Sequence, residues 1–124
     1  MKTWIVGVDL RHRSDGAVRF AAWLYGQTQG AVELVGIHAA PESVVAELDR
    51  FEGRAQVRER LRAEAELAVA HAGARAVFSA VELVEAQVPA EALAAARAAR
   101  AAAGLIVGRK AASDGRDLVR LGSV

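Results

Sequence analysis

The chain contains no cysteine, which excludes disulfides, thiolate nucleophiles and cysteine metal sites and fits a reducing, cytoplasmic location. The chain also lacks an excess of charge of either sign, because its 16 Lys and Arg residues are nearly balanced by 15 Asp and Glu residues. A duplex-binding surface needs roughly six to ten phosphate contacts from clustered basic residues. Apolar runs of about 18 residues, the length needed to span a membrane, are absent too. We therefore expect neither nucleic acid nor a membrane as a partner.

The length of 124 residues is typical of one domain with a full core. Hydrophobic residues make up 53% of the chain, but alanine inflates that share, so the larger residues of the strands must supply most of the packing. Neither a linker nor an internal repeat divides the sequence. We predict a single domain over residues 1–124.

Two short apolar runs near the ends of the chain are its most informative feature, Trp4–Asp9 and Gly104–Gly108. Runs that are this short and β-branched, without polar alternation, are typical of parallel strands buried on both faces. Two more strands are predicted at Ala31–His38, before a break at Ala39-Ala40-Pro41, and at Val77–Val84. In open α/β sheets the ligand lies beyond the carboxyl ends of the strands. The sequence therefore predicts a site where the first and last runs end.

Helical patterns separate these runs. One helix starts at Ser14-Asp15, another covers Arg54–Ala72, and an alanine-rich helix runs from Pro89 to about Ala103. Glu42–Phe51 is expected to hold only a helical turn or two within a long polar connection. The alternation predicts an α/β fold with an open, mainly parallel sheet of at least four strands and helices on both faces, a half-Rossmann arrangement.

The order and spacing of these pieces resemble the universal stress protein family. The residues that carry the resemblance are Ile5–Asp9, Gly36–Ala40, Val88–Leu93 and Gly104–Gly108, and it extends over essentially the whole chain. The resemblance implies an adenine-nucleotide α-hydrolase-like fold and a regulatory domain of the stress response that binds ATP, with Mg²⁺ only alongside ATP. It implies no catalytic residues and at most weak ATP hydrolysis.

Many members of that family bind ATP through a tail motif of Gly, two residues, Gly, nine residues, Gly, and Ser or Thr. Gly108 matches its first position, and Gly122-Ser123 matches its last pair. Ala111 stands where the second glycine is expected, and ten residues rather than nine separate it from Gly122. Glycines in such a loop let backbone N–H groups approach phosphate oxygens. This chain therefore carries a degenerate phosphate loop.

The resemblance assigns ten residues to nucleotide binding: Gly7, Val8, Asp9, Ala39, Val107, Gly108, Lys110, Gly122, Ser123 and Val124. It places Asp9 at the adenosine end and Lys110, with Arg109, at the phosphates. The alternatives are a solvated aspartate that caps a loop and two isolated surface cations. The spacing of His12, His38 and His71 fits no metal motif, so each is expected to be structural or on the surface, and no metal site is predicted.

In the family, the Gly-Ser pair begins a further helix and a strand that is commonly used at a dimer interface, whereas this sequence stops at Val124. We therefore expect a C-terminally truncated domain in which the outer edge of the fourth strand is left unpaired. Such an edge favours a homodimer or a partner that supplies a strand. The alternative function is a dimerisation or interaction module of the same family that binds no nucleotide.

Overall fold

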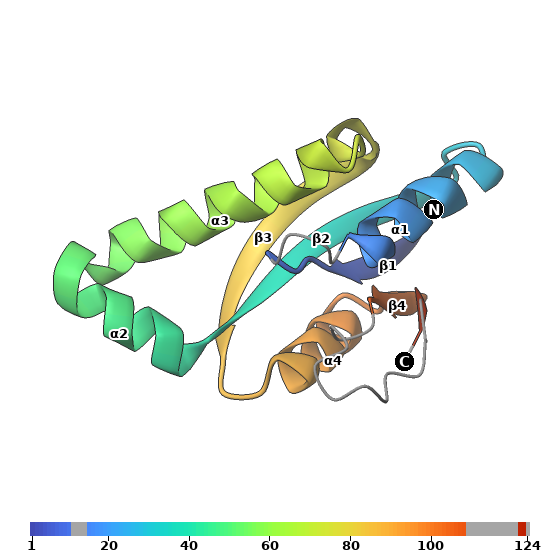
Figure 1. The fold of residues 1–124 in the computed structure, drawn as a ribbon. Helices are drawn as coiled ribbons and strands as arrows, with labels where there is room; N and C mark the ends of the chain where they lie inside the picture. The colour runs from blue at the N-terminus through green and yellow to red at the C-terminus, as the bar shows by residue number, and fades with distance from the viewer. Residues whose placement is uncertain (11–14, 109–121, 124) are drawn as a thin grey trace, which may run out of the picture.

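The computed structural model describes residues 1–10, 15–108 and 122–123. Its elements follow in the order β1 (Lys2–Gly7), α1 (Gly16–Gln27), β2 (Val32–Pro41), α2 (Glu42–Glu52), α3 (Arg54–His71), a short 3-10 turn (Arg75–Val77), β3 (Phe78–Ala86), α4 (Pro89–Ala99), β4 (Gly104–Val107) and β5 (Gly122–Ser123) (Figure 1). The strands form one sheet in the order β3-β2-β1-β4-β5. The first four strands are parallel and β5 is antiparallel to β4. The predicted α/β fold with a mainly parallel sheet is confirmed.

Helices cover both faces of the sheet, as predicted, but unequally (Figure 1). On one face, α1 and α3 bury Ala21 and Val69 against strand residues such as Val6 and Leu34. On the other face, α4 buries Leu93 against the central strand residues Ile5, Val35 and Ile37. Three helices therefore share one face, and α4 covers the opposite face.

The segment after the second strand is more regular than the sequence predicted. β2 continues through the expected break, and its last residue, Pro41, still pairs with Ala86 of β3. The expected polar connection is an 11-residue helix, α2, whose Val45 is completely buried against residues of α3 and β3 such as Val57 and Leu83. Tertiary packing of this kind stabilises helices whose local sequence signal is weak.

A carboxylate of β3 holds the α2–α3 hairpin to the sheet. Glu85 accepts hydrogen bonds from Arg54 and from Arg58 at the start of α3, the latter at 2.5 Å. Its side chain is only 14% exposed. These hydrogen bonds, from Arg54 first and then Arg58, hold the pKa of Glu85 below its usual value, although partial burial opposes the shift. Along α3, Arg60 also pairs with Glu64 one turn away, at 3.2 Å.

Within the described residues, every helix is too short or too polar to cross a membrane.

Candidate functional site

The strand order places a topological switch point between β1 and β4. From β1 the chain moves through β2 to β3 on one side, and α4 then returns it to the opposite side of β1. The two strands run parallel, with Trp4 opposite Gly104 and Val6 opposite Ile106. Their carboxyl ends therefore lie side by side, as the sequence predicted. Ligands of open α/β sheets bind in the crevice at such a point.

The neighbouring strands extend beyond this point. Pairing between β1 and β2 ends at Gly7 and Ile37, whereas β2 and β3 stay paired up to Pro41 and Ala86. The last residues of β2, including Ala39, therefore form a ledge beside the end of β1. A ledge of this kind presents the main chain of a strand toward the crevice.

Two glycines lie at the carboxyl ends of β1 and β4. A Cβ on Gly7 would lie 3.2 Å from both Leu93 Cδ1 and Val107 Cγ1, so this position is closely packed. Gly108 is exposed, and a Cβ there would lie 3.7 Å from the backbone nitrogen of Ala17. Gly108 therefore allows close approach to the first turn of α1.

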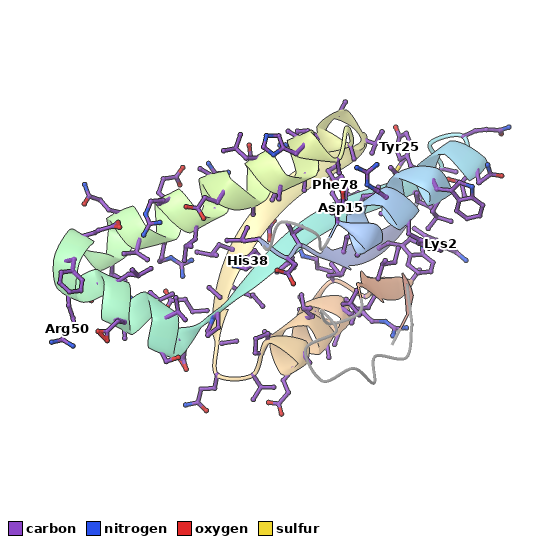
Figure 2. All side chains as sticks on the ribbon, viewed as in Figure 1. Lys2, Asp15, Tyr25, His38, Arg50 and Phe78 are labelled. Carbon is purple, nitrogen blue, oxygen red and sulfur yellow. The ribbon has the colours of Figure 1, made fainter. Side chains whose placement is uncertain are left out.

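Among the described residues, no side chain caps the amino terminus of α1. Asp15, at the start of the helix in Figure 2, makes no capping hydrogen bond, and its carboxylate accepts from Arg19 Nε at 2.7 Å instead. The first turn of α1 contains no acidic residue. Backbone N–H groups at a helix amino terminus carry partial positive charge and bind anions well. The amino terminus of α1, next to exposed Gly108, therefore has the polarity that an anion requires.

The described residues that were predicted to bind the nucleotide divide between the two faces of the sheet. Ala39 and Val107 pack against the cluster beneath α4, toward which Gly7 also faces. The Val8 side chain points to the opposite face, where it is buried, with 4% exposed, in the cluster beneath α1 and α3. The Val8 side chain is therefore not available to a ligand at this rim. Asp9 follows directly and is half-buried.

The ends of the predicted phosphate motif meet in space. Gly122 pairs with Val107, and Ser123 pairs with Ile106, so Gly122 lies beside the residue that precedes Gly108. β5 was not predicted, and the expectation that the edge of β4 is wholly unpaired is wrong. Two-residue strands escape periodicity analysis because alternation cannot be recognised over so short a length. The predicted contacts of Lys110 and Val124, and of Arg109, lie outside the described residues.

Three contacts at this rim had no sequence prediction. Leu93 of α4 lies against Gly7, and Ala17 lies near Gly108. His38, expected only to be structural or on the surface, has its Nδ1 2.8 Å from the Val8 carbonyl oxygen. Ala17 lies in the first turn of α1, and only the packing of α1 across β4 brings it to this rim. Among the described residues, no group of three or more His, Asp or Glu side chains could hold a metal ion.

These features define the chain as an α/β protein whose parallel sheet has a topological switch point between β1 and β4. The family model described as the universal stress protein family matches residues 1–124, and the chain belongs to that family. A crystal structure of a universal stress protein in complex with cAMP matches with a TM-score of 0.54 and 23% identity, covering 86% of this chain and 75% of that one. That likeness concerns the fold. No curated protein matches the chain.

Proposed function

We propose that this universal stress protein domain is a regulatory module that binds an adenine nucleotide, ATP in the first instance, in the crevice between β1 and β4. The observation that carries the proposal is the adjacency of the two strand ends, with exposed Gly108 against the uncapped first turn of α1. The nucleotide in the similar structure, a universal stress protein with cAMP, supports the same class of ligand. Family membership supports it independently.

In this arrangement the phosphates lie over exposed Gly108 and beside the amino terminus of α1, near Gly122. The adenosine lies toward Asp9 and the ledge that contains Ala39. The Asp9 carboxylate is an acceptor suited to ribose hydroxyls or to the adenine amino group. Following the family resemblance, we give Lys110 the role of supplying charge to the phosphates and include Ser123 and Val124 among the residues that bind the nucleotide. Mg²⁺ accompanies ATP only through the phosphates.

Catalysis is not part of this proposal beyond weak ATP hydrolysis. Efficient phosphoryl transfer requires a positioned base or water-orienting group together with charge stabilisation of the transferred phosphate. The described rim offers Asp9 and main-chain groups, without a nucleophile and base within reach of each other. These residues fit a protein that binds the nucleotide reversibly and changes its conformation or assembly in response. The absence of cysteine fits a cytoplasmic location for such a protein.

The substitution Gly108→Ala tests the site directly. The new Cβ has its nearest neighbours at 3.7 and 3.9 Å, so the fold accommodates it, but it adds a methyl group where the proposed phosphate approaches the amino terminus of α1. We expect isothermal titration to show ATP binding to the wild type and at least tenfold weaker binding to the variant. The matched control is Gly26→Ala, whose Cβ meets nothing within 4 Å and lies on α1.

Thermal unfolding provides a second measurement. At ATP concentrations of a hundred times Kd, the wild type gains about 2.7 kcal/mol, which raises the melting temperature of a domain of this size by roughly 10 °C. An unchanged wild-type melting temperature at millimolar ATP contradicts the proposal. Equal affinities of the wild type and Gly108→Ala would place the nucleotide elsewhere.

The alternative is a homodimerisation or interaction module, and one observation favours it. β5 pairs with Ile106 and Val107, whereas Gly104 and Leu105 have no partner on that side among the described residues. A second copy or another protein can extend the sheet there. Light scattering over a range of protein concentrations tests this reading, which predicts a dimer whose stability does not change with ATP.

A further inference from the structure

The hydrogen bond between His38 and Val8 joins the ends of two strands at the proposed site. His38 Nδ1 lies 2.8 Å from the Val8 carbonyl oxygen, which can only accept a hydrogen bond. Nδ1 must therefore carry the proton, which it does in the protonated ring and in one of the two neutral tautomers. His38, which is labelled in Figure 2, acts here as a donor to the main chain of Val8, the residue that follows β1.

This hydrogen bond links the chain after β1 to β2 just beyond the last regular pair of the two strands. The register ends at Gly7 and Ile37, and the Val8 N–H then donates to the Ile37 carbonyl at 2.9 Å. Gly36 provides space for Val8, because a Cβ there would lie 3.1 Å from Val8 Cγ2. Val8 is thus held through its N–H, its carbonyl oxygen and its side chain. The residue that follows is Asp9.

Peptide planarity extends this restraint to Asp9. The Val8 carbonyl and the Asp9 N–H belong to one rigid plane and point in opposite directions in a trans peptide. The Val8 carbonyl points to His38 on β2. The Asp9 N–H therefore points away from β2, toward the side on which β4 lies. Loss of the His38 donor would remove this restraint from the peptide that leads into Asp9.

We propose that His38 is the positioning residue for the adenosine end of the nucleotide site, acting through the Val8–Asp9 peptide and without contacting the ligand. This inference rests on the proposed nucleotide-binding function. It predicts an effect on the recognition of adenosine and none on the recognition of phosphates, which lie at the other end of the crevice near Gly108.

Three substitutions separate this role from a general structural one. In His38→Asn, the amide nitrogen lies as many bonds from Cβ as Nδ1 does, so the variant can keep the donor. In His38→Gln, the amide lies one bond farther out, and in His38→Ala the donor is lost. We expect titration with ATP and with adenosine to show at least tenfold weaker binding for the alanine and glutamine variants and near wild-type binding for the asparagine variant.

Inorganic tripolyphosphate serves as the matched probe, because it carries the charge of ATP without the adenosine. Its affinity should be the same in all four proteins. Urea unfolding of each variant verifies that the domain is folded at the temperature of the titrations. Nitrogen-15 NMR of the wild type should show His38 with its proton on Nδ1 at neutral pH.

The outcomes are distinct. If the wild type binds neither ATP nor adenosine, the proposed function fails and the inference fails with it. If the wild type binds both and His38→Ala binds them equally well, the inference alone is overturned. Equal weakening of ATP, adenosine and tripolyphosphate, or failure of His38→Asn to restore binding in a folded variant, also overturns it.

Discussion

Substitution of Gly104 by alanine tests how the position of β4, and with it Gly108, is determined. Gly104 pairs directly with Trp4 of β1, and the Trp4 ring lies over it. A Cβ at this position would lie 2.3 Å from Cζ3 and 2.7 Å from Cε3 of that ring, well inside van der Waals contact. Either the strand or the ring must move.

Both movements are costly by similar amounts. Forcing an extra methyl into a packed site costs roughly 1–3 kcal/mol. If the half-buried Trp4 ring instead swings into water, exposure of about 100 Å² of apolar surface costs about 2.5 kcal/mol at 25 cal/mol per Å². We therefore expect Gly104→Ala to lower the free energy of unfolding by about 2–3 kcal/mol, or the melting temperature by roughly 10 °C.

Urea unfolding followed by circular dichroism measures this change. Gly26→Ala is the control, because its Cβ meets nothing within 4 Å and alanine in a helix stabilises by about 0.5–1 kcal/mol over glycine. In a double-mutant cycle, Trp4→Val should remove most of the cost of Gly104→Ala, since the atoms that clash are gone. A cost below about 0.5 kcal/mol with Trp4 present, or an equal cost without it, refutes this reasoning.

Two further substitutions test the anchors of the fold by urea unfolding. Glu85→Gln should lower stability at pH 7 by about 1–2 kcal/mol, because the carboxylate accepts two charge-assisted hydrogen bonds from Arg54 and Arg58. The folded-state pKa of Glu85 is lowered, so its contribution is complete above its ordinary pKa of about 4.3 and is lost as the pH falls through the folded value. The difference from the wild type should therefore shrink below about pH 4, and a difference independent of pH contradicts the ion-pair explanation. Leu34→Ala, at a fully buried position of β2, should lower the free energy of unfolding by about 2–5 kcal/mol. Its control is Leu67→Ala on α3, where the side chain is 57% exposed and the loss should be small. Similar losses for the two variants would contradict the assignment of the core.

Much of the fold could be predicted because each major element carries its own signal. The runs Trp4–Asp9 and Gly104–Gly108 lack polar alternation, which indicates strands buried on both faces, and Pro89 indicates the start of a helix. α2 was missed because its signal is weak locally: Val45 becomes buried only when α3 packs beside it. β5 was missed because two residues carry no periodicity.

The candidate site was predicted as a location and only partly as a set of contacts. Asp9, Gly7 and Gly108 lie at the rim where the strand ends were expected. Because Gly7 pairs with Ile37, Val8 comes opposite His38, and Ala39 is the next residue of β2. Successive residues of a strand point to opposite faces, so the side chains of Val8 and Ala39 lie on different faces of the sheet. His38 was identified but not given a role, since its partner, Val8, is 30 residues away.

The sequence by itself determined the family, the alternation of strands and helices and the glycines at the strand ends, because periodicity, caps and turn residues act over a few neighbouring positions. Only the tertiary structure decided which strands are neighbours, which helix end meets Gly108 and which carbonyl His38 holds. Those choices depend on packing between segments far apart in the chain, where the buried area of the whole sheet, and not local preference, selects the arrangement.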